Sequence, residues 1–518
     1  MVETACCIVL LRSHRVKKMP FQDTGLPTKG LGYLNYLREV MSQPLGSWEG
    51  FYRAQSPAMN FALRYQLAFA SYALALMSQR TPAYKAPYAE ALRGAVEKML
   101  HVAVWGYWRV PAGASAGVAS QGHVAVLAGP HQSGPLGPPS DPIARDNVQY
   151  SGHLSTMLGL YEKVSGDRRF DEPFALEDPE SGARYTYTHS EVAGRIYTQM
   201  RENGFGGVCC ERGMAYVPCN NYSLASNALH DLLHGTAYGR ANGRWLKTVR
   251  DKMVLKGPAV RGVFGTSYMK DFHLATPLAF NFTDVWGLAF LLPFDRPLVR
   301  KLYGRFKRKA IHREGEGAYV ESSGMSERME ISDVPINTGF GLILAKGMGD
   351  LKLADALLRH ATSAFDGGWD GTRYLFKGAH RTLHATALYA LAECMQPGGG
   401  DFTRLFHAPA ASSADEPALL QLEDASGRVG VFQAEYSRQE RVLRIGLRQV
   451  GDSAALRQAT PVSVTLRIGN LPGRVNVQVT GTPQEEYGWS GDGNQQFYLT
   501  VGPHEDARCK FQVVEPAV

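Results

Sequence analysis

The feature that most constrains this fold is a change of hydrophobic period near residue 405 of the 518-residue chain. From about residue 33 to 395, apolar residues recur at steps of three and four, as they do on the buried face of a helix. After residue 405, apolar and polar residues alternate, which is typical of β-strands. The sequence therefore predicts a mainly α protein that ends in a β domain.

The helical part consists of long apolar runs that are separated by Gly- and Pro-rich turns. Several runs are apolar almost all round, which indicates helices buried on more than one side. The runs are 61–77, 89–104, 152–166, 222–235, 284–292, 338–350 and 383–395. We expect ten to twelve helices in one run, because a four-helix bundle is too small for them, and short turns between them predict paired helices arranged as a toroid.

The alternating runs after residue 405 predict a small antiparallel β-sandwich over 415–518, behind a linker at 408–417. The expected strands are 428–436, 441–450, 462–469, 473–481 and 495–502. This division leaves 1–30 as an N-terminal extension and 31–405 as the helical domain. It also predicts no helix after residue 430 and no sheet within 220–400.

Composition excludes several classes of protein. Hydrophobic content of 44% and charged content of 20% describe an ordinary globular chain. The net charge of +7 is spread thinly, and its densest stretch, 300–313, carries apolar residues at helical spacing. That spacing favours the solvated face of an amphipathic helix over a nucleic-acid patch. We therefore expect no nucleic-acid partner.

The N-terminus, MVETACCIVLLRSHRVKK, places an acid before a short apolar run and the bases after it, which is the wrong order for a secretory signal. No apolar run reaches eighteen residues, so we expect no stable membrane insertion. Seven cysteines is an odd number for a disulfide framework. These features predict a cytoplasmic protein.

The motifs of the common cofactor enzymes are missing. The sequence holds no DDxxD or DxDD cluster, no Walker loop, no GxGxxG after a strand and no GxSxG elbow. Zinc sites usually pair cysteines two to four residues apart, and the chain has no such set. We expect neither a metal nor an organic cofactor.

Three cysteines lie within eleven positions in the stretch GVCCERGMAYVPCN, residues 207–220. Cys210 and Cys219 are nine positions apart, and Glu211 lies beside the first of them. Buried structural thiols and catalytic thiols brought together by a turn both fit this pattern. The polar, loop-like surroundings favour function, because loops between helices carry it in such architectures.

A second candidate lies in DNVQYSGHLSTML, residues 146–158. Tyr150 and His153 share the first turns of one helix, where a histidine tends to stay neutral and can act as a base. A satisfied core histidine is the alternative. The Gly-, Pro- and Ala-rich segment 111–140 leads into this helix, and we expect it to cover the site as a loop.

Several segments taken together resemble the linalool dehydratase/isomerase family. They are YLNYLREV, RYQLAFASYALA, KMLHVAVWGYW, DPIARDNVQYSGHLSTMLGLYEKVSGDRRF, GGVCCERGMAYVPCN, LHDLLHGTAYGRANGRWL and TGFGLILAKGMGD, which occur in the family's order across residues 31–395. The resemblance implies an (α/α)6 barrel and cofactor-free dehydration and isomerisation of terpene alcohols. It also implies an active site at a subunit interface, and thus a homo-oligomer.

Carried over residue by residue, the resemblance implies that Cys210, Cys219 and His153 are catalytic. It places Tyr65 in the same site, and Gln149 falls where the family has a pocket-lining methionine. Two departures stand out. The family's catalytic aspartate aligns with Arg38, next to Glu39. A second tyrosine aligns with Phe282, close to Asp284.

These residues predict a lyase, isomerase or cyclase that acts on a terpenoid or similar polyene alcohol. Glu39 or Asp284 would supply the missing carboxylate. Tyr150, Glu211, Phe282 and Trp286 would bind substrate, since aromatic faces stabilise a cation. Two alternatives stay open: a polysaccharide-active glycosidase or uronate lyase of the toroid type, and a binding protein without catalytic activity. An apolar small molecule is the expected partner of the first hypothesis.

Overall fold

The protein is described here as a computed structural model. The structure describes residues 25–52, 62–111, 136–211, 213–257, 262–322, 333–413, 415–471, 475–480, 486–489 and 494–513. The chain divides into two compact units. The helical unit contains 32–79 and 87–411, and the β unit contains 412–518 together with the short segments 1–31 and 80–86.

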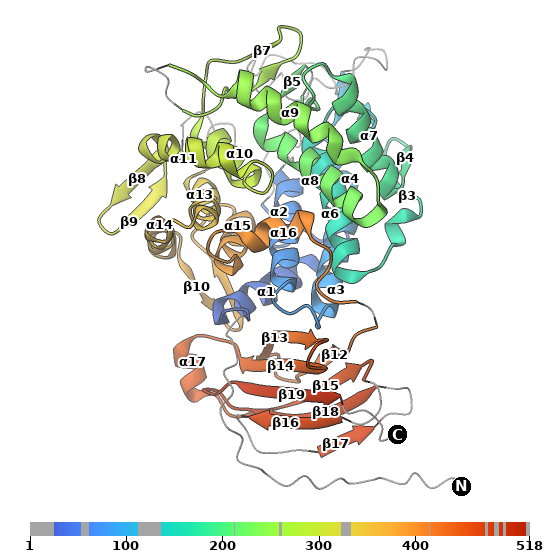
Figure 1. The fold of residues 1–518 in the computed structure, drawn as a ribbon, viewed down its shortest axis with the longest axis vertical. Coiled ribbons are helices and arrows are strands. Elements are labelled where there is room, and N and C mark those ends of the chain that lie inside the picture. Colours follow the sequence, from blue (N-terminus) through green and yellow to red (C-terminus); the bar gives the residue numbers. More distant parts are fainter. Residues whose placement is uncertain are drawn as a thin grey trace. The chain divides into compact units, whose positions relative to one another are not determined.

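Within the described part of the helical unit, six buried helices pack in a closed ring (Figure 1). Each helix of the ring contacts the next one along the chain, and the last returns to the first. The ring helices are α2 (Ala62–Ser78), α6 (Val148–Ser165), α8 (Val217–His234), α10 (Asn281–Leu291), α13 (Val334–Met348) and α15 (Thr382–Cys394). These correspond to the runs that are apolar almost all round, so the expectation of a mainly helical unit is confirmed.

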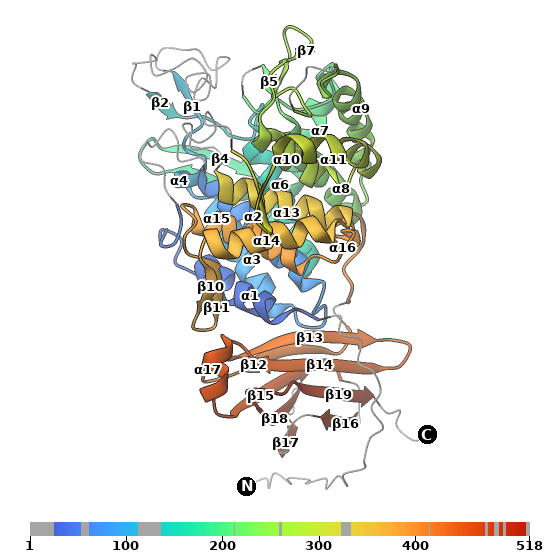
Figure 2. The same cartoon turned by 90° about the vertical axis from the view of Figure 1, so that its left-hand side faces the viewer.

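Further helices flank this ring, as Figures 1 and 2 show. They are α1 (Thr28–Met41), α3 (Ala86–Met99), α4 (Val102–Trp105), α7 (His189–Glu202), α9 (Asn242–Thr248), α11 (Arg296–Ala310), α14 (Leu351–Ala364) and α16 (Gly400–His407). Short turns of other helix types are η2 (Arg169–Asp171), η3 (Tyr238–Ala241) and η4 (Val249–Met253). A closed inner ring is what an (α/α)6 barrel requires; the matching outer ring of six stays a prediction.

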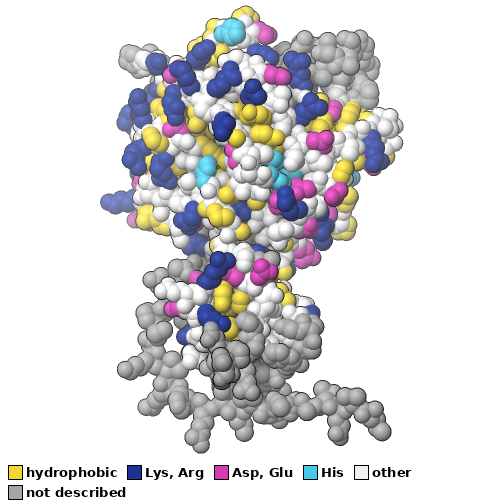
Figure 3. Space-filling view, turned by 45° about the vertical axis from the view of Figure 1, so that its right-hand side comes forward, with side chains coloured by type: hydrophobic (Ala, Val, Ile, Leu, Met, Phe, Trp, Pro, Cys, Tyr) yellow, Lys and Arg dark blue, Asp and Glu magenta, His cyan; other side chains and the backbone are white. Residues whose placement is uncertain are grey.

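The flanking helix α11 carries the densest basic stretch of the chain. Leu298, Val299, Leu302 and Phe306 are buried, while Arg300, Lys301, Arg308 and Lys309 are exposed. This is the amphipathic helix that the spacing predicts. Figure 3 shows basic side chains scattered among uncharged and apolar ones on one face of the helical unit. Among the described residues, no helix has the length and apolar content that crossing a membrane demands.

Short antiparallel strands occupy several connections between the helices. They are β1 (Arg109–Pro111) with β2 (Leu136–Pro139), β3 (Phe174–Asp178) with β4 (Ala183–Tyr187), β5 (Met214–Ala215) with β6 (Tyr268–Met269) and β7 (Leu274–Ala275), β8 (Ile311–Glu314) with β9 (Gly317–Val320), and β10 (Gly367–Asp370) with β11 (Arg373–Phe376). The expectation of no sheet within 220–400 is therefore wrong. These strands are two to four residues long there, too short for alternation to stand out from turn signals.

Most of the long segment 111–140 lies outside the described residues. Its two ends are held together, because Arg109 pairs with Pro139 in the β1–β2 ladder. The backbone amide of Ser140 also donates to the carbonyl of Trp108 over 2.7 Å. The segment therefore leaves and re-enters the fold at one place, a few residues before α6. Its expected role over the site stays a prediction.

The β unit contains two four-stranded antiparallel sheets. One has the order β12 (Ala418–Glu423), β15 (Val462–Gly469), β18 (Gln495–Val501), β17 (Glu486–Trp489). The other has the order β13 (Val429–Ser437), β14 (Val442–Gln449), β19 (Ala507–Val513), β16 (Val475–Thr480). A short helix, α17 (Ser453–Gln458), interrupts the strands, so the expectation of no helix after residue 430 is also wrong. Asp452 caps α17 by accepting from the amide of Ala455.

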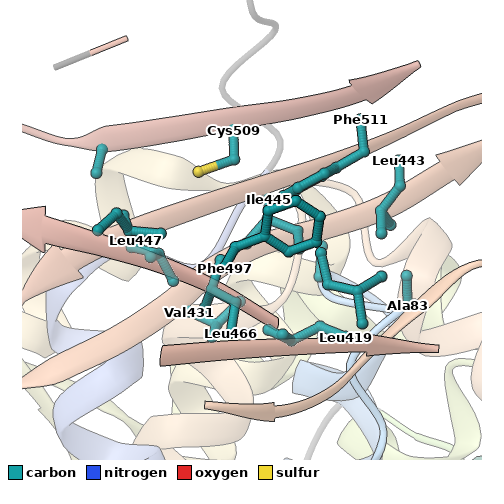
Figure 4. Close-up of a cluster of buried hydrophobic side chains, with 14 of the residues drawn as sticks. Ala83, Leu419, Val431, Leu443, Ile445, Leu447, Leu466, Phe497, Cys509 and Phe511 are labelled. Atoms are coloured by element: carbon teal, nitrogen blue, oxygen red, sulfur yellow. The ribbon is translucent and has the colours of Figure 1, made fainter. Parts of the chain in front are cut away.

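Inward-facing side chains of both sheets form one hydrophobic core (Figure 4). Phe497 from one sheet and Phe511 from the other meet edge to face, with ring centroids 4.8 Å apart. Ala83, from the separate segment 80–86, joins this core and bonds through its backbone to Ala434 and Leu419. The β unit is thus completed by a segment more than three hundred residues away in sequence.

Candidate active site

The six ring helices place a cluster of side chains near their N-terminal halves. Tyr65 is the fourth residue of α2, Gln149 the second of α6, Cys219 the third of α8 and His384 the third of α15. Helix N-termini carry a partial positive charge, which disfavours cations and stabilises neutral or negative groups nearby. The ring therefore assembles residues from distant parts of the sequence in one electrostatic environment.

Two buried thiols form the polar end of this cluster. The Cys210 and Cys219 thiols lie within hydrogen-bonding reach of each other, and both side chains are buried. Burial, followed by the interaction with Cys219, raises the pKa of the Cys210 thiol well above its usual value. The thiol form therefore predominates at neutral pH, so Cys210 carries a proton but is a weak acid by itself and a poor thiolate nucleophile.

A buried arginine lies beside the thiols. The Arg64 guanidinium is fully buried and donates to the Tyr65 hydroxyl over 3.2 Å. Its central carbon also lies over the Tyr65 and Tyr107 rings, 4.5 and 4.3 Å from their centroids. Burial alone would lower the pKa of Arg64, but the neighbouring phenols and the Cys210 thiol outweigh it and the pKa is raised. Arg64 therefore stays charged and supplies fixed positive potential at this end.

Tyr65 and Gln149 connect the arginine to helix α6. The Tyr65 hydroxyl donates to Gln149 Oε1 over 2.8 Å. The Tyr107 hydroxyl donates to Asn147 Oδ1, also over 2.8 Å, just before the first turn of α6. Burial raises the pKa of Tyr65 well above its usual value, so its phenol stays protonated.

Glu211 is a carboxylic acid with a raised pKa, and it lies next to the Cys210 thiol. Burial raises its pKa to about 7, against the opposing effects of Tyr216 and Arg64. The Tyr216 hydroxyl donates to Glu211 Oε2 over 3.3 Å. The charge of Glu211 contributes to the raised pKa of the Cys210 thiol, so the two groups are electrostatic neighbours. An acid with this pKa can both hold and release a proton near neutral pH.

His153 is buried among aromatic rings, and its ring meets that of Tyr65 edge to face with centroids 5.6 Å apart. Its Nδ1 lies 2.6 Å from the Tyr72 hydroxyl, and Tyr222 packs on its ring with centroids 3.8 Å apart. Its Nε2 is buried and has no hydrogen-bond partner within the described part of the chain. Burial, then the charge of Arg64, lowers the pKa of His153 well below its usual value. The imidazole is therefore neutral and can accept a proton.

Aromatic side chains from four of the ring helices pack together in one cluster, and four of these side chains contact His153. Tyr65 meets Trp286 edge to face at 5.2 Å, and Trp286 stacks on Phe340 at 5.5 Å. The full set is Tyr65, Phe69, Tyr72, Tyr222, Trp286, Phe290 and Phe340. We call this set the aromatic cluster. Its ring faces carry negative quadrupolar potential, which stabilises a nearby cation.

His384 is a second buried histidine in contact with the aromatic cluster. Its ring stacks on Phe69 with centroids 5.1 Å apart and planes 15° from parallel. Both of its ring nitrogens are buried without a hydrogen-bond partner among the described residues. Burial, then the charge of Arg381, lowers its pKa well below the usual value. A buried imidazole with two unpaired nitrogens is costly unless a ligand pairs with them.

The structure gives both predicted replacement carboxylates other partners. Glu39 is exposed on α1 and forms an ion pair with Arg373, with 2.6 Å between Oε1 and Nη1. Asp284 is buried and accepts the backbone amides of Val263 and Phe264 over 2.6 and 2.8 Å. Its carboxylate holds the connection before α10 in place, although burial raises its pKa to about 7.

The other predicted binding residues divide between the cluster and its surroundings. Trp286 belongs to the aromatic cluster, and its Nε1 donates to the Tyr222 hydroxyl over 2.6 Å. Tyr150 points elsewhere, because its hydroxyl donates to the Met99 carbonyl over 3.0 Å. Phe282 stacks on Phe280, 6.0 Å between centroids. The structure therefore gives Tyr150 and Phe282 packing partners of their own.

Sequence reasoning missed Arg64 and His384. Arg64 had a signal, since it is the only charged residue in the run FALRYQLAFASYALALM. A charge on a helix that is buried all round requires partners inside the protein. His384 had a weaker signal, as a polar residue at the start of another apolar run. Neither pattern shows by itself that the two residues approach the thiols and His153.

A buried, preorganised set of proton donors and neutral bases is the arrangement of an enzyme that works by acid–base catalysis. The sequence model for linalool dehydratase/isomerase matches residues 64–381, which is more than half of the chain. The chain belongs to the linalool dehydratase/isomerase family, and it is an enzyme of the dehydratase/isomerase kind.

The solved structures that match this chain include three enzymes whose names refer to carbohydrate substrates. An unsaturated glucuronyl hydrolase specific for heparin matches 72% of this chain and 95% of its own, at 9% identity and a TM-score of 0.40. The α-1,6-mannanase from Salegentibacter sp. HEL1_6 matches 70% and 98%, at 10% identity and a TM-score of 0.39. A family 76 glycoside hydrolase from a bovine Bacteroides thetaiotaomicron strain matches 71% and 77%, at 10% identity and a TM-score of 0.41.

Proposed function

We propose that this protein is a cofactor-independent lyase, isomerase or cyclase that acts on a terpenoid or similar polyene alcohol. The observation that carries the proposal is that the Cys210–Cys219 thiol pair and neutral His153 are both neighbours of Tyr65, a member of the aromatic cluster. Proton donors and a proton acceptor therefore share one neighbouring side chain. Elimination and isomerisation of an allylic alcohol need both an acid and a base at the substrate.

Glu211 takes the role of the missing family carboxylate in this proposal. With a pKa of about 7, it is a stronger acid than the neighbouring thiol. It protonates the substrate hydroxyl, directly or through Cys210, and the C–O bond breaks with its electron pair leaving as water. In the second case Cys210 gives its proton to the substrate and takes one from Glu211. Cys210 is then a thiol again, and Glu211 is the net proton donor.

His153 removes the second proton. With its Nδ1 proton directed at the Tyr72 oxygen, the lone pair on Nε2 is available. Nε2 takes a proton from the carbon next to the cation, and that C–H pair becomes the new double bond. The net change is loss of water. Return of water to the other allylic carbon gives isomerisation, and attack by a second double bond gives cyclisation.

Arg64 orients the reaction. Its fixed positive charge repels a carbocation and attracts the departing oxygen. The cation is stabilised by the ring faces of Trp286 and Phe340 in the aromatic cluster. The alcohol end of the substrate faces the arginine and the thiols, and the polyene faces the aromatic cluster.

The experiment is incubation of the purified protein with prenyl alcohols of increasing length, with product analysis by gas chromatography and mass spectrometry. We expect turnover that persists with chelator while circular dichroism shows an intact fold. Cys210→Ala should abolish it. Cys509→Ala, a thiol of the β-unit core, is the matched control and should retain it. No turnover of any alcohol, or full turnover in Cys210→Ala, contradicts the proposal.

A polysaccharide-active enzyme is the weaker candidate. It needs a pair of free carboxyl groups beside the sugar. Of the acids that could serve, Asp284 is held by two backbone amides, and Glu211 accepts a hydrogen bond from the Tyr216 hydroxyl. The thiol pair and the aromatic cluster have no part in that chemistry.

A further inference from the structure

A second cluster of polar side chains lies in the helical unit, at the opposite ends of α6 and α8 from the thiols. It consists of Glu162 in the last turn of α6, Asp171 in η2, His189 at the start of α7 and His234 at the end of α8. By helical rise, His153 and Glu162 are about 13 Å apart along α6, and Cys219 and His234 are about 22 Å apart along α8. The proposed chemistry therefore uses none of these four residues.

The four side chains have the geometry of a metal ligand set. One potential ligand atom from each lies within 4.8 Å of all the others. His234 Nε2 is 2.9 Å from Glu162 Oε2 and 3.8 Å from Asp171 Oδ1, and His189 Nδ1 is 3.6 Å from Glu162 Oε2. Ligands of a tetrahedral zinc ion at about 2.05 Å are separated by about 3.4 Å, so these distances bracket the ideal value.

Two buried polar atoms of the cluster, Asp171 Oδ1 and His189 Nε2, make no hydrogen bond within the described residues. Asp171 Oδ1 lies 3.8 Å from His234 Nε2, beyond hydrogen-bonding distance, and the His189 atom that faces the cluster is Nδ1. His189 itself is 1% exposed. A carboxylate oxygen in this position normally has a partner, and a bound cation would provide one. Two imidazoles with two carboxylates form a ligand set that suits Zn²⁺ and balances its charge.

We propose that Glu162, Asp171, His189 and His234 form a structural zinc site that fastens the ends of α6, α7 and α8 to η2. Four protein ligands close the coordination shell, which is the pattern of structural and not catalytic zinc. When zinc binds His234 Nε2, the proton that Nε2 shares with Glu162 is released to solvent. The site holds in place the two helices that carry His153 and Cys219 at their other ends.

Arg168 contacts three of the four side chains and would compete with a metal ion for them. Its Nε lies 2.8 Å from Asp171 and 3.4 Å from Glu162, and its Nη2 lies 3.0 Å from His234 Nδ1. Zinc on Nε2 leaves the proton of His234 on Nδ1, which can then no longer accept from Arg168. The Arg168 side chain is 58% exposed and can turn into solvent. Replacing Arg168 should therefore strengthen zinc binding, whereas a salt-bridge network without metal would simply be weakened.

The test is metal analysis of the full-length protein purified without chelator, followed by zinc titration of the stripped protein against a chromophoric chelator. We expect about one zinc per chain, a melting temperature that rises with added zinc, and at least tenfold weaker binding in His189→Ala and His234→Ala. Arg168→Gln should bind at least tenfold more tightly.

His230→Ala is the matched control. The His230 ring stacks on His234 with centroids 4.4 Å apart, but its nitrogens contact the hydroxyls of Ser190 and Thr236. Its zinc affinity should equal that of the unmodified protein. The proposal is overturned if no variant binds zinc, if His230→Ala loses as much affinity as His234→Ala, or if Cys210→Ala removes the bound metal. Alcohol turnover by stripped but folded protein tests the proposed function separately.

Discussion

Replacing Glu211 by glutamine separates the stability of this site from its activity. Burial raises the Glu211 pKa from 4.5 to about 7, so the folded protein holds the ionised form at a cost. A difference of about 2.5 pKa units corresponds to about 3 kcal/mol, taken as an upper figure because the side chain is only partly buried by its surface area. Glutamine has no such ionisation and keeps an oxygen that can accept from Tyr216.

The sign follows from proton binding. Between pH 4.5 and 7 the folded state binds more protons at Glu211 than the unfolded state, so this group lowers stability progressively as pH rises. Above pH 7 the loss is complete and constant. We therefore expect Glu211→Gln to match the unmodified protein near pH 4.5 and to exceed its unfolding free energy by up to about 3 kcal/mol at pH 8.

The assay is urea denaturation, followed by circular dichroism, at several values between pH 4.5 and 8.5. Glu180→Gln, at an exposed hairpin turn, is the control for loss of a carboxylate at the surface. Turnover provides the second measurement. It should fall tenfold per unit above pH 7 in the unmodified protein, because the acid form of Glu211 is lost, and it should be nearly absent in the variant. A stability difference that is flat with pH, or a variant with normal turnover, refutes this reasoning.

Three further substitutions test the remaining parts of the site. Cys219→Ala should abolish turnover, and it should lower the free energy of unfolding by only about 1 kcal/mol because little side-chain volume is lost. Denaturation and product assays on the same sample measure both quantities. Residual turnover above one tenth of the unmodified rate would contradict this prediction. His384→Phe keeps the stack on Phe69 but removes both ring nitrogens, so it should raise the free energy of unfolding. It should also lower turnover or change the product ratio. Unchanged turnover and products would show that His384 has only a packing role. Trp286→Leu should slow the cationic step by up to about thirtyfold, equivalent to about 2 kcal/mol of lost cation–π stabilisation, as measured by single-turnover kinetics. If Trp286→Leu weakened substrate binding by this factor and left the rate of the chemical step unchanged, the result would argue against a cationic intermediate.

The sequence by itself determined the class and order of the structural elements. The ring helices were readable because a helix buried on more than one side needs apolar residues on several faces, and α10 and α13 carry them. Alternation similarly identified β13, β14, β15, β16 and β18 within a residue or two at most ends. The family was readable from the quoted segments, and the match over 64–381 confirms it, whereas the catalytic roles of the thiol pair, His153 and Tyr65 stay predictions.

Tertiary structure decided everything that depends on which side chains meet. Glu39 and Asp284 were reasonable candidates by position, yet Glu39 pairs with Arg373 from the β10–β11 hairpin and Asp284 holds two backbone amides. Glu211, adjacent in sequence to Cys210, shares the raised pKa of about 7 with Asp284, but Glu211 is the acid whose charge acts on the Cys210 thiol. The sequence records the residue types, but the burial and the neighbouring charges that set a pKa arise only after distant segments have packed.

The same reason applies to Arg64, His384 and the cluster around His234. Their ring partners, hydrogen bonds and ion pairs join elements that are tens to hundreds of residues apart. The spacing of apolar residues within a segment indicates which face of a helix is buried, because buried positions are mostly apolar. It carries no information about which polar groups face one another across a ring of helices, since that depends on helix order and packing angle.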